Sequence, residues 1–301
     1  MKKWKLYLAG TVWSTIFGLS FLMTKGALDA FSPFELIFLR FALATIALGA
    51  LSRFGAFKLS FRGKPRLPLV LICLFQPIVY FLCETFGLRE TASSTAGLIL
   101  GALPAVVAAL SVPMLKERLS PRQSIGLFVS VAGVVLIVLD GRSRAGAIGG
   151  DSLRGVLLVV GALVSAAFYN VFSRRARALY SPLETTFAMM ASGAVFFGVM
   201  VLIELLVSGS RGGLGMFQRA TPAAWGAVAY LGILSSVVAF FLVNLSLSRL
   251  KASQASIFGT ITPIVALVAG IVFRGESLSL LELVGAAAVI SGVWATNARQ
   301  A

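Results

Sequence analysis

Long apolar runs alternate with short polar connections over almost the whole chain. A helix that crosses the hydrocarbon core of a bilayer needs about 20 mostly apolar residues, and ten stretches of this kind can be marked out. The expected spans cover residues 6–27, 33–52, 67–88, 93–115, 122–140, 154–173, 182–207, 222–247, 253–273 and 280–297. The pattern predicts an all-α membrane protein of ten transmembrane helices, with no room for a soluble domain.

Composition agrees with this pattern. The chain has 301 residues, of which 58% are hydrophobic and 12% charged, too few polar side chains to cover a soluble domain. The net charge of +15 would fit a nucleic-acid partner only if the basic residues gathered on one face, whereas they lie between apolar runs. The chain has no His, and its two Cys, Cys73 and Cys83, lie in one apolar run, so no metal site or disulfide is expected. We expect no cofactor and no nucleic acid; the expected partners are a small-molecule substrate and membrane lipid.

The charges also predict orientation. Lys2, Lys3 and Lys5 precede the first run as in a signal peptide, but the run is long enough to span and lacks a small-residue cleavage site. With the N-terminus inside, most of the 26 Lys and Arg residues lie on the cytoplasmic side. We therefore expect a multi-pass protein of the cell inner membrane with both termini in the cytoplasm.

Four expected helix starts carry their own capping signals. In each, a Ser is followed three residues later by Glu or Gln, the pattern of a capping box. The pairs are Ser32 with Glu35, Ser120 with Gln123, Ser181 with Glu184 and Ser279 with Glu282. We interpret these carboxylates as helix caps in preference to substrate ligands.

The chain also repeats itself. Residues 93–134 align with residues 252–293 without a gap. The matches include Pro104 with Pro263, Glu117 with Glu276, Gly126 with Gly285, Gly133 with Gly292, and, at a second offset, Ser32 and Glu35 with Ser181 and Glu184. Because each half holds five spans, an odd number, the second must cross the membrane in the opposite sense, which predicts two inverted five-helix repeats. Residues 1–140 form the first repeat, 141–153 a linker and 154–301 the second repeat.

These motifs resemble the drug/metabolite transporter superfamily, and within it the EamA-like ten-helix transporters. The resemblance rests on Ser32-Pro33 followed by Arg40, on Pro104, on the turn that begins at Glu117, and on their counterparts in the second half. It implies a central cavity walled by spans three, four, eight and nine, and export of amino acids, related metabolites or drugs. The membrane carboxylate that small multidrug exporters carry in their first helix has no counterpart in span one, which argues against a cationic-drug antiporter.

Polar side chains inside the spans are the candidate substrate-binding residues, because such groups are costly in hydrocarbon unless they face a cavity or a partner. They are Trp13, Ser14, Gln76, Tyr80, Glu84, Ser94, Ser165, Tyr169, Asn170, Asn244, Ser256 and Thr260. Gln76, Tyr80 and Glu84 recur every four residues and predict a polar stripe on span three, where Pro77 is expected to kink the helix. Glu84 can bind a substrate amine or carry a coupling proton; alternatively, it reaches the outer edge or pairs with Arg89.

Prolines and three further charges complete the candidates. Pro104 and Pro263 lie at the same depth of spans four and nine, where they can bend each helix and gate a central site, although the small residues around them also fit plain packing. Arg40 can neutralise a substrate carboxylate, but we favour a structural ion pair with Glu35 or Glu84. Glu117 and Glu276 lie at helix C-terminal ends, where the helix dipole disfavours an acid, so a neighbouring Arg or a mouth-closing contact must hold them.

The leading hypothesis is an alternating-access exporter of amino acids or similar metabolites, and not an enzyme. A carrier of sugar phosphates or nucleotide sugars is the nearest rival, but phosphate recognition needs several basic residues and Arg40 is the only one found within a span. A membrane enzyme would need a clustered nucleophile, acid/base pair or metal site, which the chain does not show. A passive channel is the third alternative. The sequence leaves the solute, the direction, the coupling ion and the oligomeric state open.

Overall fold

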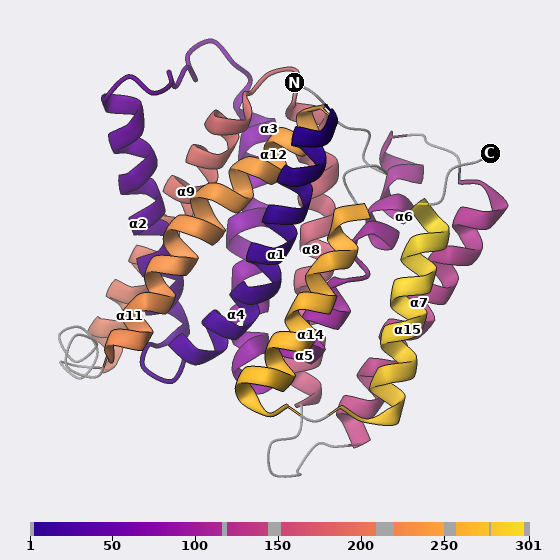
Figure 1. Cartoon of the computed structure of the whole chain (residues 1–301). Coiled ribbons are helices and arrows are strands. Elements are labelled where there is room, and N and C mark those ends of the chain that lie inside the picture. The colour runs from indigo at the N-terminus through magenta and orange to yellow at the C-terminus, as the bar shows by residue number, and fades with distance from the viewer. Residues whose placement is uncertain are drawn as a thin grey trace.

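The structure is a computed structural model that describes residues 3–115, 119–143, 152–208, 220–249, 257–276 and 278–297. Within these ranges the chain is helical and contains no strand (Figure 1). The helices are α1 (Lys3–Ala27), α2 (Pro33–Arg53), α3 (Arg66–Cys73), η1 (Leu74–Val79), α4 (Tyr80–Glu90), α5 (Ser93–Leu100), α6 (Leu103–Leu115), α7 (Pro121–Ser143), α8 (Leu153–Ala176), α9 (Pro182–Ser208), α11 (Pro222–Ala229), η3 (Tyr230–Ala239), α12 (Phe240–Arg249), η4 (Ile257–Thr260), α14 (Ile261–Arg274) and α15 (Leu280–Asn297).

These helices form a multi-pass membrane protein. In the described part of the chain, eight helical stretches are long and apolar enough to cross a bilayer, and two shorter apolar ones follow them, Phe258–Arg274 and Leu280–Thr296. The shorter pair corresponds to the expected spans nine and ten. Every expected span therefore has its helix, although the start of span nine, residues 253–256, lies outside the described residues.

Local sequence signals set several helix starts as predicted. The Ser32 hydroxyl accepts from the Glu35 backbone N–H while the Glu35 carboxylate accepts from the Ser32 backbone N–H, a complete capping box. The same reciprocal bonds join Ser120 with Gln123, Ser181 with Glu184, and Ser279 with Glu282. Each satisfies backbone donors that would otherwise lack a partner at a membrane edge.

Four of the spans depart from a regular α-helix within the described residues. Span three changes from α3 to α4 through the π-helical turn η1, where Gln76 is non-helical at φ −145° and ψ 115° directly before Pro77. Span four breaks at Gly101 and Ala102 between α5 and α6. Span eight passes through the π-helical segment η3, and span nine begins with the 3₁₀ turn η4. The predicted kink at Pro77 is confirmed, whereas η3 contains no proline and was not predicted.

Glycines bring two helix pairs close together. α7 and α15 lie side by side and run in opposite directions (Figure 1). A Cβ atom added to Gly133 would lie 2.6 Å from the Gly285 carbonyl oxygen, and one added to Gly126 would lie 2.6 Å from the Gly292 carbonyl oxygen. Such backbone contact requires residues without a side chain, as is common between membrane helices. α5 and α14 also pack together, with Gly101 directly against Pro263.

The chain enters and leaves the bundle at the same end. α1 begins and α15 ends at the upper end in Figure 1. Since successive spans alternate in direction, α6, α8 and α12 also end there, whereas α1, α4 and α14 end at the opposite, lower end. α8 lies between the two larger apolar clusters of the interior and contributes side chains to both, Val159 to one and Tyr169 to the other.

Candidate functional site

A cavity lies between spans one, two, three, four, six, eight and nine. Its empty volume is about 1180 Å³ when the part open to solvent is counted. Its lining includes Ser111, Arg174 and Leu247, which lie close to the upper ends of α6, α8 and α12. Toward the lower end the lining reaches Phe21 and Glu84 and goes no further. The cavity therefore extends from the middle of the bundle to the end where α1 begins.

The break in span three places Gln76 at this cavity. Gln76 is buried, with 5% of its surface exposed, and its side chain is part of the lining. A broken helix leaves carbonyl groups without their usual donors. The hydroxyl of Ser165 in α8 donates to one of them, the Phe75 carbonyl, at 2.7 Å. Ser165, predicted to bind substrate, thus supports the break that presents Gln76.

Arg40 reaches the cavity from α2 and is held by neutral groups. Its Nε donates to the Ser236 hydroxyl at 3.2 Å and its Nη2 to the Ser235 hydroxyl at 3.0 Å. The guanidinium carbon lies 4.4 Å from the centre of the Phe81 ring, a cation–π contact. In the part of the chain that the structure describes, no ion-pair contact joins Arg40 to Glu35 or Glu84, although Arg40 and Glu84 lie close enough to interact electrostatically.

Glu84 lines the same cavity from α4. Only 2% of its surface is exposed, and its Oε2 accepts from the Thr85 hydroxyl at 3.2 Å. Within the described ranges it makes no ion-pair contact with Arg89, whose side chain is exposed. The predicted stripe of Gln76, Tyr80 and Glu84 is present: all three side chains face the cavity.

Tyr169 and Asn170 line the cavity from α8, and a hydrogen-bond network behind them fixes Tyr169. The Tyr169 hydroxyl donates to Oδ1 of Asn244 at 3.0 Å, and Nδ2 of Asn244 donates to the Thr186 hydroxyl at 3.0 Å. Asn244 itself is not part of the lining. The Asn170 side-chain amide N–H donates to the Ala166 carbonyl of its own helix at 2.8 Å.

The remaining predicted site residues are divided between the cavity lining and other places in the bundle. Trp13 and Pro104 line the cavity, but the Ser14 hydroxyl donates to the Phe258 carbonyl at 2.6 Å and so ties α1 to span nine. Thr260 and Pro263 lie at the start of α14, outside the lining. Glu117 and Ser256 fall outside the described residues.

Glu276 and Ser94 meet at the lower end of the bundle, beyond the cavity floor. The Glu276 carboxylate accepts from the backbone N–H groups of Ser93 at 3.0 Å and Ser94 at 2.9 Å, and from the Ser93 hydroxyl at 2.7 Å. It thereby caps the N-terminus of α5, where the helix dipole favours a negative charge. Burial alone would raise the pKa of Glu276, but these hydrogen bonds outweigh it and hold the pKa below its ordinary value.

A second group of contacts joins the same end. The Lys25 ammonium of α1 donates to the Leu88 carbonyl at 2.7 Å and to the Thr91 carbonyl, both near the end of α4. The Glu276 and Lys25 contacts connect span nine and span one to the two spans that flank the cavity floor. Hydrogen bonds therefore hold Glu276 at its helix end, where the sequence predicted an adjacent Arg or a mouth-closing contact.

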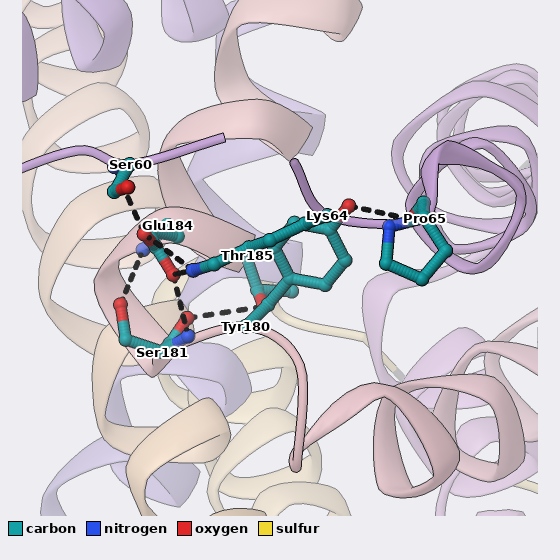
Figure 2. Close-up of polar contacts among 7 residues, drawn as sticks. All are labelled: Ser60, Lys64, Pro65, Tyr180, Ser181, Glu184 and Thr185. Carbon is teal, nitrogen blue, oxygen red and sulfur yellow. Dashed lines mark hydrogen bonds and ion pairs between the residues drawn. The ribbon is translucent and has the colours of Figure 1, made fainter. Parts of the chain in front are cut away.

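At the upper end, charged contacts tie the loop before α3 to α9, as Figure 2 shows. The Lys64 ammonium lies 2.7 Å from Oε2 of Glu184, and Oε1 of Glu184 accepts from the Ser60 backbone N–H at 2.9 Å. Nearby, the Tyr180 hydroxyl donates to the Pro65 carbonyl at 2.6 Å. Glu184 therefore caps α9, as predicted, and also binds the loop before α3.

A membrane-embedded bundle with a cavity open toward one end is typical of transport proteins, and comparison with known proteins identifies the family. The model of the EamA-like transporter family matches residues 4–139 and, separately, residues 153–298. The chain belongs to the EamA-like transporter family, within the drug/metabolite transporter superfamily.

Relatives cover nearly the full length. The chain is 36% identical over 292 residues to the uncharacterized transporter YcxC of Bacillus subtilis, covering 97% of this chain and 92% of that one. It is 28% identical over 301 residues to a probable terminal-alkyne amino-acid exporter of Streptantibioticus cattleyicolor, covering 98% and 93%. A crystal structure with 21% identity superposes at a TM-score of 0.69, covering 97% and 95%, and supports the same fold.

Proposed function

We propose that this chain is an alternating-access transporter that exports amino acids or related small metabolites. The observation that carries the proposal is the cavity itself. It presents a few polar and charged side chains within a largely apolar lining, extends from the middle of the bundle to the upper end, and is lined by interrupted helices, as in secondary transporters whose discontinuous spans form the solute site. The relative named as a probable amino-acid exporter supports the substrate class.

The two halves, in this proposal, are inverted repeats, residues 1–140 and 154–301 joined by 141–153. Two observations support it. The family model matches once in each half. The α7–α15 interface is also reciprocal: Gly126 contacts Gly292, and their equivalents Gly285 and Gly133 contact each other. A contact that maps onto itself when the halves are exchanged is what a two-fold relation produces.

The proposed orientation has both termini in the cytoplasm of a cell whose inner membrane holds the protein. Basic residues such as Lys64 and Arg174 lie at the upper end, where α1 begins, in agreement with the positive-inside rule. The cavity then opens to the cytoplasm, and Glu276 closes the outer side. The conformation is inward-open, ready to load a solute for export.

Solute counterflow in proteoliposomes tests the proposal. Vesicles loaded with unlabelled leucine, phenylalanine or glutamine should accumulate the same labelled amino acid transiently, and protein-free vesicles should not. Unlabelled solute on the far side should accelerate the flux, which a passive pore does not show. Chemical change of the label would favour an enzyme, and no flux of any amino acid would contradict the proposed substrate class.

Organic phosphates form the second candidate class, because Arg174 lines the cavity together with Arg40 and adds a basic residue that the sequence analysis did not place there. Glu84 in the same lining disfavours a polyanion. The same vesicles loaded with glucose 6-phosphate distinguish the two classes by which solute exchanges.

Glu84 is also the proposed coupling residue, since it is a carboxylate in the cavity wall. Replacement of Glu84 by Gln should remove the dependence of transport on a proton gradient. Unchanged dependence with intact transport would contradict this role.

A further inference from the structure

The cavity holds two opposite charges that do not neutralise each other by contact. Arg40 comes from α2 and Glu84 from α4, and each has only 2% of its surface exposed. No ion-pair contact reaches either of them anywhere in the described ranges. Nη1 of Arg40 and Oε1 of Glu84 also make no hydrogen bond there. Each charge therefore keeps one atom available to a molecule in the cavity.

The neighbouring polar groups divide into two sets. The hydroxyls of Ser20, Tyr169 and Ser246 already donate to protein acceptors, so they form a satisfied wall. By contrast, no hydrogen bond within the described residues engages the Gln76 amide or the Tyr80 hydroxyl. The indole N–H of Trp13 is buried without a partner. Gln76, Tyr80 and Trp13 line the same cavity as the two charges.

Buried charges in a membrane protein are costly unless they are paired or solvated. The hydroxyls of Ser235 and Ser236 and the ring of Phe81 position the guanidinium from η3 and α4, and Glu84 interacts with it electrostatically without forming an ion-pair contact in the described ranges. Glu84 receives one hydroxyl, from Thr85. A solute that carries a carboxylate and an ammonium group can satisfy both at once and brings no net charge into the bundle.

We infer that Arg40 and Glu84 are the specificity-determining pair of the site, Arg40 binding the carboxylate and Glu84 the ammonium group of a zwitterionic solute. This inference rests on the proposed transport function and names the chemistry by which the cavity selects its solute. Phe17, Phe21 and Leu103 supply an apolar wall beside the charges, which suits a solute with an apolar side chain.

The test compares each amino acid with analogues that lack one charge. The probes are L-phenylalanine with 3-phenylpropionate and 2-phenylethylamine, and L-leucine with 4-methylpentanoate and 3-methylbutylamine. Apparent dissociation constants come from the rise in melting temperature of the purified full-length protein with probe concentration. The intact amino acid should bind at least about tenfold more tightly than either analogue, since each analogue loses a charge-assisted hydrogen bond.

Variants assign the two charges separately. Glu84→Gln should abolish the preference for the amino acid over the acid analogue, and Arg40→Gln the preference over the amine. Glu204→Gln is the matched control, because Glu204 accepts a hydrogen bond from Ser32 away from the cavity and should leave both preferences intact. If Arg40→Gln does not fold, Arg40→Lys takes its place: it should weaken the amino acid and the acid equally and leave the amine unchanged.

Three outcomes would overturn the inference. The first is wild-type protein that binds an analogue as tightly as its amino acid, the second is equal weakening of all probes of a series by Glu84→Gln, and the third is a protein that no probe stabilises. Counterflow separates this result from the proposed function. If the protein transports a solute but the two variants do not lose their respective preferences, the transport function stands and the charge pair does not. If the variants lose these preferences but no solute is transported, the binding site stands and the transport function does not.

Discussion

Inside a membrane helix, a serine hydroxyl can bond to a carbonyl of its own helix or to a group on another helix. Ser246 does the first, donating to the Leu242 carbonyl at 2.7 Å. Ser14 and Ser165 do the second, each tying one span to a neighbour. The sequence shows the hydroxyl but not its acceptor, because the acceptor becomes available only when another span bends beside it. This is why Ser14 and Ser165 were predicted as ligands but are placed as supports.

For acidic residues too, the sequence predicts local hydrogen-bond partners but not distant ones. The Glu35, Glu184 and Glu282 caps were predictable, because both partners lie within four residues. Glu204 accepts a hydrogen bond from the Ser32 hydroxyl at 2.9 Å across 172 residues, and no sequence motif near either residue predicts that pair. For Glu276 the unfavourable helix end indicated a missing partner, and only the fold identifies it as the N-terminus of α5.

In the proposed orientation the lower end of the bundle faces outward, and the Glu276 contact should make closure of this outer end depend on pH. A lowered pKa in the closed form means that ionised Glu276 favours closure above the ordinary carboxyl pKa, and that this contribution is lost as the pH falls through the lowered value. Acidification and Glu276→Gln should therefore both open the outer end. The measurement is the rate at which a membrane-impermeant thiol reagent modifies Thr24→Cys, a fully buried position near that end, with Cys73 and Cys83 replaced by Ala.

Glu204→Gln serves as control, measured at each pH so that titration of the thiol itself cancels. The modification rate of this control should match that of the Thr24→Cys protein that keeps Glu204 and Glu276. The Glu276→Gln variant should react faster at neutral pH and lose the acid dependence. Equal rates in all three proteins across the pH range would show that Glu276 does not hold the outer end closed.

At the scale of the helix, a proline made one interruption predictable, whereas an interruption without proline was not predicted. Pro77 made the break in span three predictable, because a proline removes a backbone hydrogen-bond donor. η3 interrupts span eight without proline, through the widened turns of a π-helix that place Ser235 and Ser236 toward Arg40. Its residues are as apolar and helix-compatible as those of an unbroken span. The interruption depends on tertiary packing that the pattern does not encode.

The α7–α15 crossing predicts a pair of equivalent effects. Gly133→Ala places a methyl group 2.6 Å from the Gly285 carbonyl oxygen, and Gly292→Ala places one 2.5 Å from the Gly126 carbonyl oxygen. Backbone atoms cannot move aside as flexible side chains do, so each variant should lose about 1–3 kcal/mol of stability. Thermal unfolding in detergent measures the loss.

Gly226→Ala provides the matched control, because nothing lies within 4 Å of its added methyl group and the residue is also in a transmembrane helix. It should be neutral or slightly stabilising, as Ala is the better helix former. Since Gly133 and Gly292 are equivalent positions of the proposed repeats, similar losses support the two-fold relation. A loss at one position and none at the other would contradict it.

For the whole molecule, the apolar pattern predicted the existence of the helices and most of their boundaries, because span length is set by the bilayer. It could not place the cavity mouth, since that depends on which end of the bundle is closed in a given conformation. The cavity reaches Arg174 at one end, while Glu276 and Lys25 join spans at the other. Alternating access requires this asymmetry to reverse during transport, so a covalent link across the closed end should separate binding from transport.

Ser93 and Glu276 lie on the two sides of that end, in hydrogen-bond contact at 2.7 Å. Cysteines at both positions, introduced where Cys73 and Cys83 are Ala and joined by a short bis-methanethiosulfonate, should hold the form that we propose to be inward-open. Solute should still raise the melting temperature, because the open mouth is at the other end, but counterflow should fall to the level of protein-free vesicles and return after reduction. Each single-cysteine variant treated alike should keep its counterflow. Undiminished flux through the linked protein would mean that the outer end need not open there, and the solute path would have to leave the bundle elsewhere.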